Sequence, residues 1–249
     1  MHQPARNPTN TAAASVRVLS LGALDHHPLR GESQPVRTGH ATITLIVSGD
    51  NAVLVDPGLP PAALEQRLDE RAGMIPSQIT HVFLTSFKPD TCRGILLFDN
   101  ARWLISPAER EAVGVPLAQT AKALAAEDGL GGEDLDPRLR QELEMQLSVL
   151  QRCQPAEDRV VPGVDLFPLP GVTPGLCGLL IPQATQTTLI CGDAIPTLEH
   201  LERGEVPAHS ASVEQAKASF AEAVEIADVL VLGRDNMLAN PVRKSYGPG

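Results

Sequence analysis

Aromatic side chains are scarce in this chain and make up only 3% of its 249 residues. The core must therefore consist mainly of Leu, Val, Ile and Ala. Hydrophobic residues, at 43% of the chain, are numerous enough to build a sizeable one. No stretch is both long and apolar enough to span a bilayer. The length suits one large α/β domain or two small ones.

Positive charge is also in short supply. The formal net charge is −10 and the sequence pI is about 5.1, whereas proteins that hold nucleic acid or an anionic membrane present a basic face. We therefore expect neither partner. The cysteines, Cys92, Cys153, Cys177 and Cys191, form no CxxC pair. We therefore expect no disulfide framework, and we expect a reducing, cytoplasmic location.

The N-terminal residues are polar and contain no apolar segment of the signal-peptide type. We expect residues 1–15 to be a disordered arm and residues 16–249 to form a single domain. Apolar runs and turn signals predict strands at 16–21, 41–48, 52–55, 81–85, 102–105, 165–169, 178–181, 187–191 and 229–232, and helices at 60–71, 90–98 and 213–227.

The segment 107–153 differs from its flanks because it is rich in Ala, Glu, Gln and Leu. Its pattern predicts two or three helices interrupted at Gly129–Gly132, the clearest of them at 137–153. Strand signals resume only after this segment. We therefore expect a helical insertion at 107–153 that lies over a cleft in the domain.

The loop that follows the strand at 81–85 has an unusual composition. Residues 84–94 read Leu-Thr-Ser-Phe-Lys-Pro-Asp-Thr-Cys-Arg-Gly, which is the frame of a dinuclear metal-binding loop, Thr-His-x-His-x-Asp-His-x-x-Gly, without its histidines. Further landmarks are Val-Asp-Pro-Gly at 55–58, Pro-Gly-Val-Thr-Pro-Gly-Leu at 170–176, Cys-Gly-Asp-Ala at 191–194 and Leu-Gly-Arg at 232–234.

Together these motifs resemble the metallo-β-lactamase fold of the glyoxalase II-like hydrolases, over roughly residues 16–238. The resemblance implies an α/β fold, an αββα four-layer sandwich of two mixed sheets with helices outside. It also implies two metal ions, usually zinc, with a bridging water that attacks an ester, thioester, amide or phosphodiester.

The ligands in that family would be five histidines and two aspartates. On this chain the histidine positions hold Ser86, Lys88, Thr91, Leu176 and Arg234, and the aspartate positions hold Asp90 and Asp193. Leucine cannot bind a metal ion, and lysine and arginine repel one. We therefore expect no dinuclear zinc site, no other metal and no cofactor.

The two cations at former ligand positions suggest a replacement for the metal charge. In the implied fold Asp56, Asp90 and Asp193 face one cleft, and buried carboxylates seldom persist unpaired. We expect Lys88 and Arg234 to form buried or half-buried ion pairs with these acids. The alternative is that both side chains extend to solvent at a site that has lost its function.

A relocated metal site is a second alternative. It would use His200 or His209 together with Asp193, although no two histidines have the spacing of ligand pairs.

The chain also offers two kinds of candidate nucleophile, a cysteine thiol and a serine paired with a lysine. Cys92 has cationic neighbours, which could activate a thiol, but a buried structural cysteine is favoured at this position. The sequence does not decide whether Cys177 or Cys191 is reactive. Ser86 and Lys88 have the spacing of a Ser–Lys dyad, but Asp90 would hold the amine protonated and so spoil it as a base.

We interpret the chain as a catalytically degenerate member of this fold, a pseudoenzyme that binds a small molecule or a protein through the former active-site cleft. The residues expected at that cleft are Asp56, Ser86, Lys88, Asp90, Thr91, Leu176, Asp193 and Arg234. Two enzymatic interpretations remain. One is a hydrolase with a relocated or single metal ion, and the other is a metal-independent enzyme built on Lys88, Asp90, Asp193 and Arg234.

Overall fold

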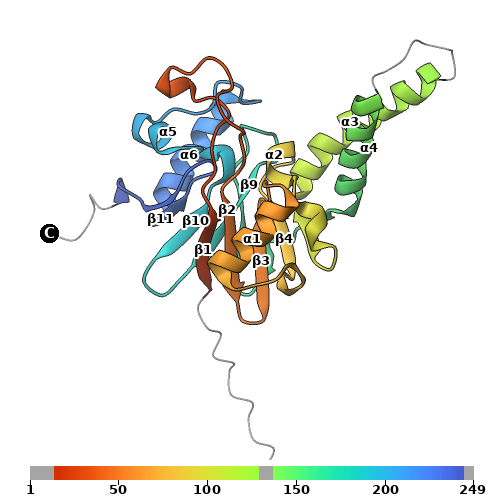
Figure 1. The fold of residues 1–249 in the computed structure, drawn as a ribbon. Helices are drawn as coiled ribbons and strands as arrows, with labels where there is room; N and C mark the ends of the chain where they lie inside the picture. The colour runs from red at the N-terminus through yellow and green to blue at the C-terminus, as the bar shows by residue number, and fades with distance from the viewer. Residues whose placement is uncertain (1–13, 129–136, 244–249) are drawn as a thin grey trace, which may run out of the picture.

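Two six-stranded sheets pack face to face in the computed structural model, which describes residues 14–128 and 137–243 (Figure 1). The first sheet has the order β1 (Ser15–Ser20), β2 (Ile43–Ser48), β3 (Asn51–Val55), β4 (His81–Leu84), β5 (Arg102–Ile105) and β6 (Gln154–Pro155). The second has the order β12 (Met237–Ala239), β11 (Val229–Val231), β10 (Thr187–Ile190), β9 (Cys177–Pro182), β8 (Val164–Pro168) and β7 (Arg159–Val161).

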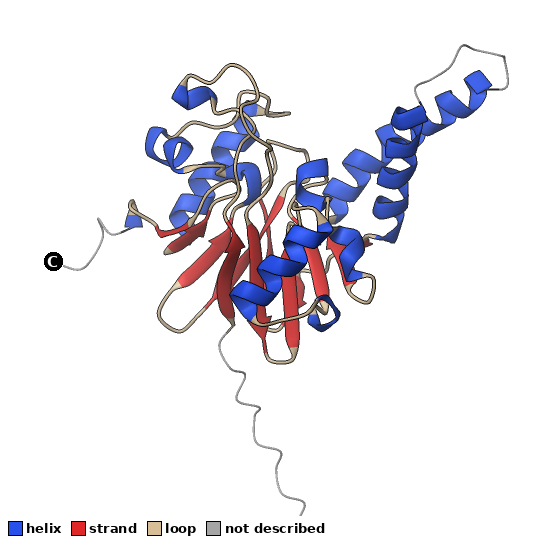
Figure 2. Ribbon diagram, viewed as in Figure 1, coloured by secondary structure: helices blue, strands red, loops and turns tan. Residues whose placement is uncertain are grey.

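Helices cover the outer faces of both sheets (Figure 2). The helices of the described residues are α1 (Pro61–Ala72), α2 (Pro89–Cys92), α3 (Pro107–Asp128), α4 (Pro137–Arg152), α5 (Leu198–Arg203) and α6 (Val213–Ile226). No helix in the described part of the chain is long and apolar enough to cross a membrane.

Three apolar clusters correspond to the three interfaces between four layers. The cluster between the sheets joins Phe83 of the first sheet to Leu179 of the second. A second cluster packs Leu64 and Leu68 of α1 against the first sheet. The third packs Ala223 of α6 against the second sheet. The αββα sandwich predicted from the sequence is therefore confirmed, with a core of aliphatic side chains.

The predicted helix at 90–98 is wrong, because the chain forms the short helix α2 and then a separate 3₁₀ turn, Ile95–Phe98. Gly94 lies between them with its amide nitrogen 2.8 Å from the carbonyl oxygen of Pro57. A Cβ at this position would collide with the carbonyl of Leu59, so the backbone turns in toward the loop after β3. Strands β6, β7 and β12 and helix α5 were not predicted, since each is too short to carry a periodic signal.

The segment 107–153 forms a hairpin of the two long helices α3 and α4, and the break expected at 129–132 lies outside the described residues. The base of the hairpin packs on the first sheet through Val149 and Leu150. Its outer part projects away from the sandwich rather than across it (Figure 1). The N-terminal arm expected at 1–15 also lies outside the described residues, except for Ala14 and for Ser15, which begins β1.

The carboxyl ends of five strands meet at one edge of the sandwich. Strands β3, β4 and β5 are mutually parallel in the first sheet, and β10 and β11 are parallel in the second. The loops that leave these strands carry Asp56, the segment 85–91, Asp193 and Arg234. Parallel strands deliver their C-terminal loops to the same edge, where ligands bind in open α/β sheets.

A pair of glycine substitutions tests the packing at this edge. A Cβ at Gly175 would overlap the backbone of Ala108 and Glu109 at the start of α3. Gly175→Ala is therefore expected to lower the free energy of unfolding by about 1–3 kcal/mol or more. Gly114→Ala is the control, since its Cβ would lie 3.6 Å from Leu150 Cδ2 in ordinary contact. It should raise stability by about 0.5–1 kcal/mol. Equal effects in urea denaturation would contradict this packing.

Candidate functional site

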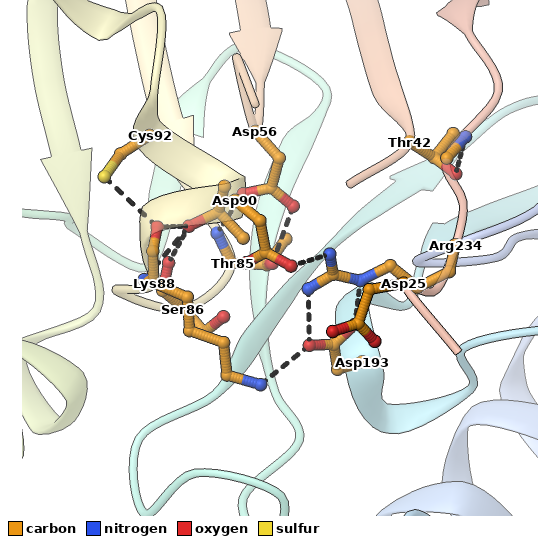
Figure 3. Close-up of polar contacts among 12 residues, drawn as sticks. Asp25, Thr42, Asp56, Thr85, Ser86, Lys88, Asp90, Cys92, Asp193 and Arg234 are labelled. Carbon is orange, nitrogen blue, oxygen red and sulfur yellow. Dashed lines mark hydrogen bonds and ion pairs between the residues drawn. The ribbon is translucent and has the colours of Figure 1, made fainter. Parts of the chain in front are cut away.

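Arg234 is the centre of a buried ionic cluster (Figure 3). Its side chain is 3% exposed. Nε lies 2.7 Å from Asp193 Oδ1 and Nη2 lies 2.9 Å from Asp193 Oδ2, a bidentate pair. The remaining nitrogen, Nη1, donates to Asp90 Oδ2. Because Arg234 follows β11 and Asp90 lies in α2, this side chain joins the loops of the two sheets.

Lys88 completes the cluster from the loop after β4. Its Nζ lies 2.8 Å from Asp193 Oδ2, and its side chain is 24% exposed. The expected pairing of Lys88 and Arg234 with Asp90 and Asp193 is therefore confirmed. The cluster contains two carboxylates and two cations, so its formal charge is balanced.

The cluster shifts the pKa values of its buried members strongly. Burial alone would raise the pKa of Asp193, but the charges and hydrogen bonds of Arg234 and Lys88 outweigh it and hold that pKa well below its usual range. Burial likewise lowers the pKa of Arg234, and Asp193 and Asp90 more than reverse the effect. Both groups stay charged at neutral pH. A carboxylate with so low a pKa is a weak general base.

Asp56 does not join the cations, contrary to expectation. Its carboxylate accepts hydrogen bonds from the backbone nitrogen of Thr85 at 2.8 Å and from Thr85 Oγ1 at 2.7 Å. Thr85 follows β4, which pairs directly with the strand that precedes Asp56. Burial raises the pKa of Asp56 to about 7, although the Thr85 hydrogen bonds lower it. Its backbone lies in the left-handed region, with φ 50°, which aspartate tolerates better than most residues.

Two of the residues at positions that the resemblance assigns to ligands, Thr91 and Leu176, serve the local structure. Thr91 Oγ1 bonds the carbonyl oxygens of Ser86 and Lys88, both at 2.8 Å, and so closes the turn that carries Lys88. Leu176 packs in the apolar cluster on the outer face of the second sheet. Ser86 is buried and its Oγ has no hydrogen-bond partner. With Lys88 Nζ on Asp193, no Ser–Lys dyad forms.

The two histidines considered for a relocated metal site do not join Asp193 in one. His200 is buried, with Nδ1 2.8 Å from Thr197 Oγ1 and its ring centroid 5.7 Å from that of His27. Burial lowers the pKa of His209, and the charges of Lys88 and Arg234 add to the effect while Asp193 opposes it. Within residues 14–128 and 137–243, no three His, Cys, Asp or Glu side chains form a group that could hold a metal ion.

The donor set also does not fit the metal ions that this type of fold implies. Both oxygens of Asp193 already accept hydrogen bonds from positively charged groups. A metal ion would have to displace Arg234 and Lys88, which occupy two of the positions assigned to ligands. Two further positions offer only hydroxyls, and Leu176 offers no donor at all.

The cysteines are thiols rather than thiolates. Cys92 is half-buried, with Sγ 3.1 Å from the carbonyl oxygen of Lys88. Burial raises the pKa of Cys92 and of Cys177 to about 12 and also raises that of Cys191. A thiol needs a lowered pKa to act as a nucleophile at neutral pH, so these residues pack rather than react.

The sequence interpretation missed Glu109, which ties the surrounding loops together. This fully buried carboxylate accepts hydrogen bonds from the backbone nitrogen of Phe87 at 2.9 Å, from Thr173 Oγ1 at 2.7 Å and from the backbone nitrogen of Gly175 at 3.1 Å. A signal was present, because Ser106-Pro107-Ala108-Glu109 has the pattern of a capping box. Ser106 Oγ does accept from the Glu109 nitrogen, at 3.0 Å, but the glutamate side chain turns to the site.

Removal of Arg234 tests the ionic cluster. Arg234→Met leaves Asp193 buried without its main partner, so the free energy of unfolding is expected to fall by about 3–5 kcal/mol. Lys88→Met should cost less, about 1 kcal/mol, because Lys88 is partly solvated. The double variant Arg234→Met/Asp193→Asn should recover part of the loss, since it no longer buries an unpaired charge. Urea denaturation measures all four proteins, and wild-type stability in Arg234→Met would refute the pairing.

The raised pKa of Asp56 predicts a pH dependence. The folded value of about 7 lies above the unfolded value of about 3.9, so the folded chain keeps a proton that the unfolded chain loses. The stabilisation from this group is complete below pH 4 and is lost as the pH rises toward 7. Relative to wild type, Asp56→Asn should gain stability between pH 5 and pH 7, by at most about 1.4 kcal/mol per pH unit. A difference that does not change across this range would contradict the assignment.

Comparisons with known proteins agree on the fold. AidC, described as a dizinc quorum-quenching lactonase, is 19% identical with a TM-score of 0.59, and the match covers 77% of this chain and 71% of AidC. A variant of AiiA from B. thuringiensis, with N-decanoyl-L-homoserine at its active site, is 19% identical with a TM-score of 0.60, covering 96% and 98%. A protein from Thermotoga maritima is 20% identical with a TM-score of 0.62, covering 92% and 100%.

These identities are low, so the structural matches establish the fold alone. A search of curated protein sequences gave no match. The family model of the metallo-β-lactamase superfamily matches residues 36–233, most of the chain. That range begins in the loop before β2 and ends one residue before Arg234. The chain therefore belongs to the metallo-β-lactamase superfamily.

Proposed function

We propose that this protein is a pseudoenzyme of the superfamily, which binds a small molecule or a protein partner through the former active-site cleft and does not hydrolyse it with bound zinc. One observation carries the proposal. Arg234 and Lys88 together engage both oxygens of Asp193, and Arg234 also engages Asp90. Side-chain cations thus neutralise the carboxylates that metal ions would need.

Asp193, Lys88 and Ser86 supply no substitute for a metal-activated water. Asp193 has a pKa too low for an effective base. Lys88 is engaged in an ion pair, and Ser86 is buried. Several solved structures of this fold are described as quorum-quenching lactonases, and we propose that this chain does not share their lactonase activity. The same groups count against a metal-independent hydrolase.

We place the proposed binding role at this edge of the sandwich. Loops from both sheets are held in place around it by Arg234, Thr91 and Glu109. Such loops, carried at the carboxyl ends of parallel strands, are where α/β proteins bind ligands. The proposal is that the chain retains this binding role without the chemistry.

Elemental analysis tests the proposal directly. The purified protein is expected to contain zinc, manganese and iron at well below one ion per chain. EDTA should leave its melting temperature unchanged relative to sodium chloride of equal ionic strength. A metal that binds the native state stabilises it by mass action. A fall of several degrees in EDTA, reversed by added zinc, would refute the proposal.

Asp193→Ala is the matched variant for this test. It leaves Arg234 and Lys88 without their carboxylate partner, so the melting temperature should fall by the same amount with and without EDTA. Wild type and Asp193→Ala should also be alike, at background, toward lactones, esters, thioesters and phosphodiesters. Hydrolysis by the wild type that disappears in Asp193→Ala would instead identify a working catalyst at this edge.

A further inference from the structure

A pocket of about 180 Å³ lies beside the ionic cluster. Its walls come from the loop after β1, near the top of Figure 1, and from the loops after β10 and β11. The loop after β1 is attached to α5, since Arg30 Nε lies 2.6 Å from Glu199 Oε1. Arg234 is common to the pocket and the cluster.

The lining of this pocket is rich in arginine, although each arginine is also paired with a carboxylate outside the lining. Arg30, Arg37 and Arg234 all contribute to it, against a single carboxylate, Asp235. The oxygens of Asp235 already accept hydrogen bonds from the backbone nitrogen atoms of Leu198, at 3.2 Å, and of Asn236, at 2.8 Å. Three guanidinium groups around one hollow stand out in a chain whose net charge is −10.

Arg30 and Arg37, at the rim of the pocket, have N–H groups that make no hydrogen bond within the described residues. A guanidinium carries five N–H groups. Arg30 uses two nitrogen atoms on Glu199, and Arg37 makes three hydrogen bonds, to Glu32 and to the carbonyl of Leu24. Their side chains are 55% and 37% exposed, so both can turn remaining N–H groups toward a ligand. Arg234, in contrast, is held in one position by its two hydrogen bonds to Asp193.

His27 adds an independent sign of a binding site. This residue lines the pocket and is 3% exposed. Its Nε2 lies 3.1 Å from both Thr197 Oγ1 and Glu199 Oε2, whereas Nδ1 is buried with no hydrogen-bond partner. Buried polar atoms without a partner are uncommon in folded proteins, and this one belongs to a residue that lines the pocket.

We propose that this pocket binds a small oxyanion, either a free phosphate or the carboxylate of a small organic acid, held by Arg30 and Arg37 at the rim and by Arg234 at the base. Arginine pairs with both groups through parallel N–H donors. The volume is below the roughly 300–1,000 Å³ of pockets for drug-sized ligands, so the ligand is small. This inference rests on the proposed function, because it names the ligand class of the cleft.

Isothermal titration calorimetry tests the inference with inorganic phosphate and with malonate as probes, in buffer that contains EDTA. Malonamide, which has the same size without charge, and sodium chloride at equal ionic strength are the ligand controls. The variants are Arg30→Gln, Arg37→Gln and the double substitution. Arg159→Gln is the protein control, since Arg159 is also exposed and also pairs with a carboxylate, that of Asp165.

The wild type and Arg159→Gln are expected to bind at least one probe, and the double variant at least tenfold more weakly. Binding of phosphate alone would assign the site to phosphate, binding of malonate alone would assign it to carboxylic acids, and either supports the inference. Equal affinity in the double variant, equal binding of malonamide, or no heat from either probe would overturn it. The metal content decides the pseudoenzyme proposal separately, so the two can fail independently.

Discussion

The buried contact between Arg234 and Asp193 holds the functional edge of this protein together. Neither group could be buried alone, because an isolated charge in a low-dielectric interior costs several kcal/mol or more. Two parallel hydrogen bonds, together with Lys88 and Asp90 at the margins, satisfy both charges. Asp193 and Arg234 therefore depend on each other to remain charged while buried.

The neighbouring loops are arranged around this cluster by neutral donors. Thr91 closes the turn that presents Lys88, and Thr85 satisfies the carboxylate of Asp56. Glu109 reaches from the first turn of α3 to backbone nitrogen atoms on two loops. The helical hairpin is thus rooted in the site even though its outer part projects away (Figure 1). Its connection to the site is through its base.

The individual strands and helices could be predicted because the evidence for them is local and periodic, whereas the four-layer arrangement was implied by the resemblance that the motifs carry. Apolar runs that alternate with turn signals locate most strands of both sheets, and the spacing of Leu64 and Leu68 locates α1. Strand β12 and helix α5 were missed because they are only three and six residues long. Such elements owe their existence to tertiary contacts, which no short window of sequence records.

The candidate site was predictable only in part, for a related reason. The motif resemblance placed Lys88, Arg234 and Asp193 at one cleft, and their charges then indicated that they would pair. The partner of Asp56 is Thr85, a neutral residue that follows the adjacent strand, and its residue type does not identify it as the partner of a buried carboxylate. Glu109 carries a local capping signal, yet its side chain serves distant backbone groups instead. Directions of side chains at loop ends are set by packing, not by local pattern.

The ionic cluster also has a consequence for the order of folding. Lys88 and Asp193 are 105 residues apart in the chain, and Asp90 and Arg234 are 144 apart. Contacts across such long loops form only after the intervening chain has been brought together, at a considerable entropic cost. We expect both sheets to be largely assembled before the cluster closes. Interactions that form after the rate-limiting step govern how fast a protein opens rather than how fast it folds. On this expectation the cluster lowers the rate of unfolding, and so lengthens the lifetime of the folded state, without changing the rate of folding.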